Sequence, residues 1–165
     1  MKHCFVIPVY NHPHYLAALL SHLNSFELPI IMVNDGSDAA CTAVLHQLAQ
    51  DYPRVDLVEH THNQGKGQAV ITGLKHAFQC GYSHALQLDA DGQHDWQDVQ
   101  RFLDTSIQHP DAMIIGQPIF DATVLFRKNV SMAVMQPIFG CGLTACLLIL
   151  KTACVAFAFI LWRRR

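Results

Sequence analysis

Five short apolar runs constrain the fold of this chain more strongly than any other feature. The runs at 4–9 and 29–33 are continuous, as is typical of strands buried on both faces of a sheet, whereas the run at 84–88 alternates. Between them, apolar residues recur at the three- and four-residue spacing of amphipathic helices. We expect strands at residues 4–9, 29–33, 55–59, 84–88 and 112–116, and helices at 13–24, after 38, at 68–78 and at 96–108.

This alternation of strands and helices, with short connections, predicts an α/β fold. The expected sheet is mainly parallel and Rossmann-like, with helices covering both faces. Pro13 suits the first turn of the first helix, and Ser37 or Asp38 can cap the second. The helix residues expected to face the core are Leu16, Leu19, Leu20, Leu23, Val44, Leu45, Leu48, Val70, Ile71, Leu74 and Phe78.

Length, charge and cysteine content narrow the class of protein. A chain of 165 residues is long enough for one domain with a hydrophobic core. Its formal net charge of -2 provides no basic face, so nucleic acid is not an expected partner. The six cysteines form no C-x-x-C pair, and we interpret Cys4 and Cys80 as reduced, mostly buried thiols of a cytoplasmic protein. Most of the eleven histidines are expected at the surface or in loops, none is assigned a metal, and no signal peptide is expected before the first strand.

Four polar clusters follow the carboxyl ends of expected strands. They lie at residues 10–11, 34–38, 63–67 and 89–94. In open α/β sheets, ligands bind at the edge where the carboxyl ends of the strands meet. The clusters therefore predict a single ligand site at that edge.

The last of these clusters contains two carboxylates, Asp89 and Asp91, one residue apart. Because side chains alternate along a strand, both carboxylates should point to the same side, and Gly92 then permits a sharp turn. Two crowded carboxylates repel each other unless a cation lies between them. Hard oxygen ligands suit Mg²⁺ or Mn²⁺, and such an ion keeps positions open for phosphate oxygens. The pattern is consistent with a metal clamp for a diphosphate, although Asp and Gly are also ordinary turn residues.

Two further turns carry candidate ligand-binding residues, each with a structural alternative. Asp35 can accept hydrogen bonds from a planar ligand such as a nucleotide base, or it can cap the following helix. Lys66 lies between two glycines at the start of a helix, which suits an anion site but also a solvated loop. The stretch is not a P-loop, and Val70 replaces the third glycine of a dinucleotide fingerprint, which disfavours a dehydrogenase.

Taken in order, these turns resemble a family 2 glycosyltransferase of the GT-A fold, especially its bacterial and dolichol-phosphate-mannose-synthase-like members. The matching motifs are Val-Ile-Pro-Val-Tyr-Asn at 6–11, Val-Asn-Asp-Gly-Ser-Asp at 33–38, Asn-Gln-Gly-Lys-Gly at 63–67 with Ala69, and Leu-Asp-Ala-Asp-Gly-Gln-His at 88–94. The second motif lacks the residue that the family has between Ser37 and Asp38.

The resemblance implies a donor that is a UDP- or GDP-linked sugar. It places Pro8, Tyr10, Asn11, Asp35 and Lys66 around the base and ribose. It also implies that Asp89 reaches the ribose or the metal, and that Asp91 and Gln93 hold Mg²⁺ or Mn²⁺. The metal would stabilise the leaving nucleoside diphosphate while an acceptor attacks the sugar with inversion. A lipid-linked acceptor and peripheral contact with the inner face of a membrane are further expectations, and no catalytic base is assigned.

The resemblance is expected to end near residue 122, which divides a donor-binding domain (1–122) from an apolar tail (123–165). The tail has no acidic residue after Phe126, where the family would place its acceptor half. A membrane helix at 139–162 is long enough, but Lys151 at its middle and the terminal arginines argue against it. The codons permitted for parts of this tail, read in another frame, can encode sequences that resemble the continuation of the family. We therefore also hypothesise a frameshift near Val124. DNA sequencing across that codon tests the hypothesis, and a tail whose DNA does not encode such sequences in another frame would exclude the frameshift.

Two functions therefore remain open from the sequence. One is a divalent-metal-dependent sugar transferase, or a truncated and inactive form of one. The other is a remnant that binds a nucleotide and transfers nothing. A sugar nucleotidyltransferase has the same architecture, but it needs a phosphate-binding loop with glycine and arginine after the first strand. Residues 10–13, Tyr-Asn-His-Pro, do not form such a loop, which disfavours this class.

Overall fold

The sheet forms the centre of the molecule in this computed structural model, which describes residues 1–91, 96–115 and 156–159. Its strand order is β3-β2-β1-β4-β6-β5, and all the strand pairs described are parallel. The strands are β1 (His3–Val9), β2 (Ile30–Asn34), β3 (Val55–Glu59), β4 (His84–Gln87), β5 (Ile114–Ile115) and β6 (Ala156–Phe159). The predicted parallel α/β sheet is thus confirmed.

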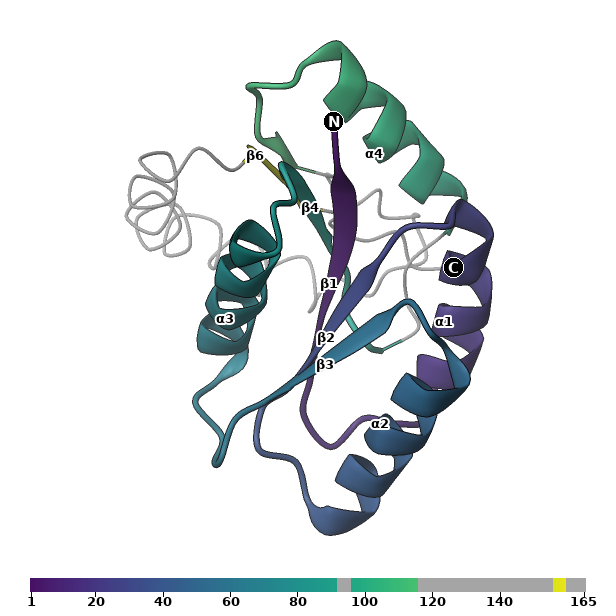
Figure 1. Cartoon of the computed structure of the whole chain (residues 1–165), viewed down its shortest axis with the longest axis vertical. Coiled ribbons are helices and arrows are strands. Elements are labelled where there is room, and N and C mark those ends of the chain that lie inside the picture. Colours follow the sequence, from purple (N-terminus) through teal and green to yellow (C-terminus); the bar gives the residue numbers. More distant parts are fainter. Residues whose placement is uncertain (92–95, 116–155, 160–165) are drawn as a thin grey trace, which may run out of the picture.

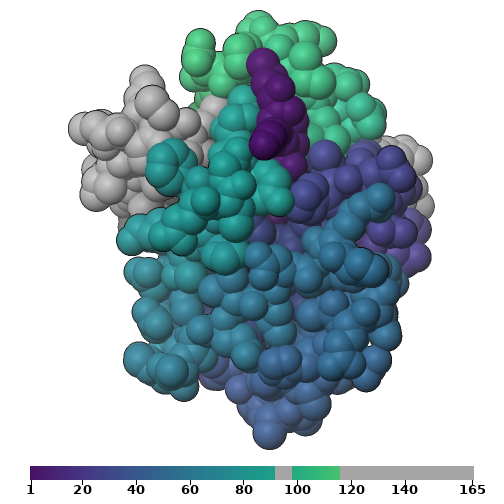
Figure 2. Space-filling view, viewed as in Figure 1, coloured from purple at the N-terminus to yellow at the C-terminus, as the bar shows by residue number. Residues whose placement is uncertain are grey.

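Helices cover both faces of this sheet. They are α1 (Leu16–Leu23), α2 (Ala39–Asp51), α3 (Lys66–Gln79) and α4 (Trp96–Gln108), with a short 3₁₀ turn at Asn24–Phe26. Helix α3 lies on one face, and α1, α2 and α4 lie on the other (Figure 1). The start of β1, in purple, reaches the surface between α4 and the teal segment that carries α3 and β4 (Figure 2).

Alternation along the strands divides the core into two layers. Phe5, Ile7 and Val9 of β1 pack with the leucines of α1 and α2. Cys4 and Val6, which point the other way, pack with the inward face of α3. Because both faces of the central strands are buried, their sequences are continuous apolar runs rather than alternating ones.

Strand register brings the polar turns to one level of the sheet. Val9 of β1 is opposite Asn34 of β2, and Asn34 is opposite Glu59 of β3. The chain therefore leaves these three strands at the same edge. The amide of Leu88, just beyond β4, still donates to the carbonyl of Val6, which carries the following residues to the same edge.

Several local expectations differ from the structure. Pro13 precedes the first helix, and its carbonyl instead accepts from the amide of Leu16 in a turn. Val44 and Phe78 are 40% and 53% exposed, because they lie at the margins of their helices' apolar stripes, so their prediction as core residues is wrong. Cys4 is buried as predicted, but Cys80 is exposed because it follows the last turn of α3.

Part of the expected tail belongs to the sheet. Residues 156–159 form β6, which pairs with β4 and β5. Their alternation of Ala and Phe suits an extended strand, so a membrane helix over 139–162 is wrong for these four residues. The rest of that span and the proposed frameshift point lie outside the described residues. Among the helices that the structure describes, none is both long and apolar enough to span a bilayer.

Helix α3 approaches the sheet closely at Gly73. A Cβ added there would lie 2.5 Å from Cγ1 of Val6 and 3.0 Å from Cγ2 of Val33. Both valines are fully buried, so neither has room to withdraw. The close approach fixes α3 against β1 and β2, and with it the start of α3 at the polar edge.

We predict that Gly73→Ala lowers the free energy of unfolding by about 1–3 kcal/mol, because the added methyl overpacks the core. Urea unfolding followed by circular dichroism measures this change. Gly67→Ala in the same helix is the control, since a Cβ there meets no atom within 4 Å. That variant should be neutral or more stable by about 0.5–1 kcal/mol. Equal stability of the two variants would show that α3 is not held by this contact.

Candidate functional site

A cavity of about 320 Å³ opens at the carboxyl edge of the sheet. Six of the eight residues predicted to bind the donor or metal line it: Pro8, Tyr10, Asp35, Lys66, Asp89 and Asp91. Val9, His12, Asn63, Ala69 and Ala90 complete the lining. Asn11 does not line the cavity, and Gln93 lies outside the described residues.

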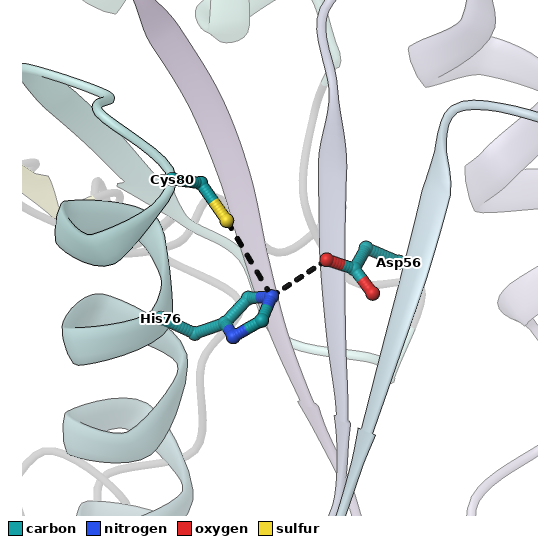
Figure 3. A group of neighbouring side chains, drawn as sticks. All are labelled: Asp56, His76 and Cys80. Atoms are coloured by element: carbon teal, nitrogen blue, oxygen red, sulfur yellow. Dashed lines mark hydrogen bonds and ion pairs between the residues drawn. The ribbon is translucent and has the colours of Figure 1, made fainter.

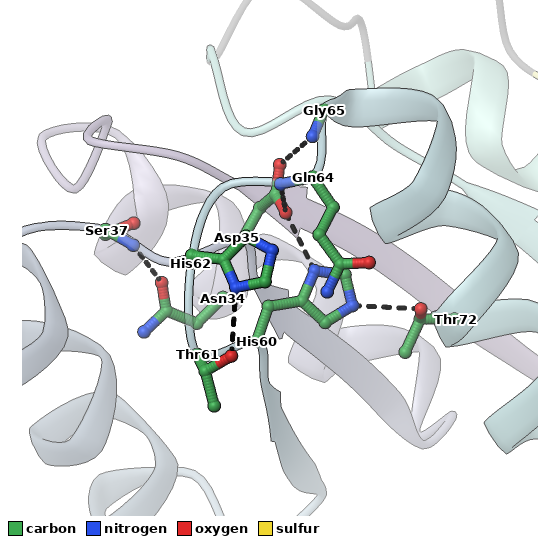
Figure 4. Close-up of polar contacts among 9 residues, drawn as sticks. All are labelled: Asn34, Asp35, Ser37, His60, Thr61, His62, Gln64, Gly65 and Thr72. Atoms are coloured by element: carbon green, nitrogen blue, oxygen red, sulfur yellow. Dashed lines mark hydrogen bonds and ion pairs between the residues drawn. The ribbon is translucent and has the colours of Figure 1, made fainter.

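Asp35, the first residue after β2, is the most buried carboxylate of the site, with a side chain 2% exposed. One carboxylate oxygen accepts from the backbone amide of Gln64 at 2.9 Å, and the other accepts from the amide of Gly65 at 2.9 Å. The ring of His60 also donates to it through Nδ1 at 2.7 Å (Figure 4). Asp35 therefore fixes the loop that leads into α3. It does not cap α2, because Asp38 does so by accepting from the amide of Cys41.

The charge of Asp35 is stabilised in place. Burial alone would raise its pKa, but hydrogen bonds from Gln64, His60 and Gly65 outweigh that effect and hold the pKa below its ordinary value. The group is consequently ionised at neutral pH. A carboxylate offers about four acceptor positions, so the three donors leave room for one more.

His60 was not identified from the sequence. Its side chain is only 7% exposed, because it lies between Asp35 and Thr72 of α3, whose hydroxyl is 2.9 Å from Nε2. A carboxylate can only accept, so Nδ1 carries a proton. The sequence feature that could have identified His60 as a site residue is its position directly after the expected strand at 55–59. His60 thus lies in a loop, as expected of most of the histidines, but its side chain is buried, and His84 on β4, which is 8% exposed, is an exception to that expectation.

Lys66, the first residue of α3, reaches across the cavity to the loop after β4. Its Nζ lies 2.7 Å from an oxygen of Asp89, whose other oxygen accepts from the side-chain Nε2 of Gln87 at 2.7 Å. The Lys66 side chain is 63% exposed. No side chain caps the start of α3, so the positive end of the helix dipole faces the same cavity. Together these features suit an anionic ligand.

Asn11 has a structural role in the loop after β1. Its φ of 52° places it in the left-handed region, which Asn tolerates better than most residues. The Asn11 side-chain oxygen accepts from the amide of Asp38, and its own amide donates to Ser37. The first and second polar turns are thereby joined beneath the cavity.

The residues present fit a hard divalent cation. Asp89 and Asp91 both line the cavity, and carboxylate oxygens are preferred ligands of Mg²⁺ and Mn²⁺. Asp89 also contacts Lys66 and Gln87, so a bound ion would compete with Lys66 for the oxygens of Asp89. Both carboxylates singled out in the sequence therefore reach the cavity, and Asp89 is held there by a lysine.

Comparison with known proteins identifies the family. The model of glycosyl transferase family 2 matches residues 4–165, so the chain belongs to this family. The match continues beyond residue 122, where the sequence predicted that the resemblance would end. The GT-A fold is supported by a mannosyltransferase, PcManGT from Pyrobaculum calidifontis, solved in complex with GDP-Man and Mn²⁺. It superposes with a TM-score of 0.59 at 20% identity, over 70% of this chain and 34% of that one.

Two curated relatives share part of their length with this chain. A UDP-N-acetylglucosamine--dolichyl-phosphate N-acetylglucosaminyltransferase of Methanococcus voltae is 28% identical over 127 residues, which are 69% of this chain and 51% of the relative. A polyprenol monophosphomannose synthase of Mycolicibacterium smegmatis is 31% identical over 102 residues, which are 60% of this chain and 38% of the relative. The chain thus spans about half or less of the length of these relatives.

We predict that Asp35→Asn lowers the free energy of unfolding at pH 7 by about 1.5–3 kcal/mol, because it removes charge-assisted hydrogen bonds. The folded pKa of Asp35 lies below its ordinary value of 3.8, so its contribution is complete above that pH and is lost as the pH falls through the folded value. The difference from the wild type should shrink below about pH 3.8 in urea titrations.

Asp51→Asn is the control for this prediction, because Asp51 is an exposed carboxylate that accepts one hydrogen bond from Gln47. Its replacement should change stability by less than about 0.5 kcal/mol. Equal effects of the two substitutions would show that Asp35 does not hold the loop.

Proposed function

We propose that this chain carries the donor half of a divalent-metal-dependent sugar transferase and binds a nucleotide-diphosphate sugar in the cavity. The observation that supports this most directly is the meeting of Asp35, Lys66, Asp89 and Asp91 around one cavity, from three separate loops. Membership of glycosyl transferase family 2 supports the same class of reaction.

The base and ribose would lie against the ends of β1 and β2. Asp35 retains acceptor capacity for an N–H group of the base, and the ring of Tyr10, which is 48% exposed, provides an apolar face beside it. Lys66 would exchange part of its contact with Asp89 for a phosphate oxygen. Asp89, held by Gln87, would then turn toward the ribose or the metal.

Asp91 would hold Mg²⁺ or Mn²⁺ against the diphosphate, with Gln93 as the further ligand predicted from the sequence. A cation bound there neutralises the charge that develops on the leaving nucleoside diphosphate. The positive end of α3 and Lys66 add to this stabilisation from the other side of the cavity.

The names of both curated relatives include a lipid phosphate or polyprenol acceptor. We propose a phosphate on a polyprenol as the acceptor, which would bring the chain into peripheral contact with a membrane. A phosphate oxygen is already ionised at neutral pH, so it can attack the sugar carbon from the face opposite the leaving group without a protein base. Inversion at that carbon would follow.

A second function, nucleotide binding without sugar transfer, needs only the residues that line the cavity. The chain spans 51% and 38% of the two relatives, so their transfer reactions do not carry over to it without a test. A chain with a donor half alone would bind the nucleotide and transfer nothing. Donor binding and sugar transfer must therefore be measured separately.

We predict that the chain binds UDP or GDP more tightly with Mn²⁺ than without it, and that Asp91→Ala removes this metal dependence. Calorimetric titration with UDP, GDP and their sugars measures both effects. Loss of the metal-bridged contact should weaken binding by at least about tenfold, which corresponds to about 1.4 kcal/mol.

Asp104→Ala is the matched control, because Asp104 lies on α4 and accepts only a surface hydrogen bond from Gln100 among the contacts described. It should leave binding unchanged. A folded chain that binds neither nucleotide would contradict the proposed donor site. Binding without transfer to a polyprenol phosphate would instead support the second function.

A further inference from the structure

A group of three potential metal ligands lies outside the donor site, between β3 and the end of α3. It consists of Asp56, His76 and Cys80 (Figure 3). His76 and Cys80 are four residues apart, so they lie on the same side of the helix end, and Asp56 faces them from β3. This pair of a histidine and a cysteine was not identified from the sequence, which assigned no metal to any histidine.

The three side chains converge on a single ring nitrogen. Nε2 of His76 is 2.6 Å from a carboxylate oxygen of Asp56 and 3.7 Å from Sγ of Cys80. All three ligand atoms lie within 4.8 Å of one another. One nitrogen cannot direct a single proton at both partners, whereas an ion between the three atoms would contact all of them.

We propose that Asp56, His76 and Cys80 form a binding site for Zn²⁺ or a similar borderline-soft divalent ion. Imidazole, thiolate and carboxylate are the ligands that zinc takes in proteins, and three of them leave a fourth position for water. This donor set differs from the oxygen ligands of the donor cavity, so the two sites select different ions.

The observed spacing is close to that of a tetrahedral zinc site. Zn–S bonds of about 2.3 Å and Zn–N bonds of about 2.0 Å hold sulfur and nitrogen about 3.5 Å apart, close to the observed 3.7 Å. A nitrogen and an oxygen on the same ion lie about 3.3 Å apart, so the Asp56 carboxylate must withdraw slightly from its present 2.6 Å. It can do so because its side chain is 56% exposed.

Access from solvent also favours a cation here. His76 is 30% exposed and Cys80 is exposed, so an ion can enter from solvent. On binding, the thiol releases its proton to solvent, and the ring proton moves from Nε2 to Nδ1.

The site is separate from the donor cavity. Lys66 and His76 are ten positions apart on α3, which is about 15 Å along the helix. An ion at the site would join β3, at the edge of the described sheet, to the end of the helix whose start faces the cavity. It would therefore stabilise the fold without taking part in sugar transfer.

Titration of the reduced full chain with Co²⁺ tests the proposal, because a cobalt–thiolate bond gives intense near-ultraviolet absorption. We expect this absorption at one equivalent, and its loss when Zn²⁺ is added. Loss of an outer-shell partner alone weakens metal binding by about 10–100-fold, so Cys80→Ser and His76→Ala should weaken it by about 100-fold or more. Both changes lie at the surface, and circular dichroism checks that the variants fold.

Two control variants should keep the absorption. Cys41→Ala removes a buried thiol of α2 that is not part of the group formed by Asp56, His76 and Cys80. His46→Ala removes a histidine that pairs with Glu59 and is likewise not part of that group. Absence of the thiolate absorption in the wild type would overturn the proposal. So would its persistence in Cys80→Ser, because another of the six cysteines would then hold the ion.

Discussion

The buried, hydrogen-bonded carboxylate of Asp35 makes the interactions on which the site depends. It follows β2 directly, and it accepts from two consecutive backbone amides at the entrance to α3 and from His60 after β3. Two segments that are distant in sequence, the end of β2 and the loop from β3 to α3, are thereby held at one edge of the sheet. Removal of the charge would weaken these part-buried hydrogen bonds and leave one of the donors without its acceptor, which costs more than the loss of an ordinary surface contact.

The position of α3 in turn determines where Lys66 lies in the cavity. Gly73 lets the helix lie directly on Val6 and Val33, and Asp35 fixes the residue before its first turn. Lys66 is then placed to reach Asp89 at 2.7 Å. A donor phosphate would thus meet a preformed positive site, and little reorganisation of the protein would be needed to bind it.

The sequence predicted the parallel sheet, its helices and six of the cavity-lining residues, because apolar runs and polar turns are local signals. It could not predict which side chains the turns bury. His60 lies in a polar loop, yet packing against Thr72 and Asp35 makes it part of the interior. Asn11 was predicted to bind the donor, but a contact with Asp38, distant in sequence, gives it a structural role. The pairing of β6 with β4 and β5 likewise depends on partners about 70 and 40 residues away.

A crystal structure of the chain with a nucleoside diphosphate and Mn²⁺ tests the central claim most directly, since anomalous scattering locates the manganese. The account predicts one manganese peak beside Asp91, bridging the two phosphates, with the base near Asp35 and a phosphate oxygen within reach of Lys66. A nucleotide bound away from the carboxyl edge of the sheet, or a manganese ion remote from Asp89 and Asp91, would contradict it.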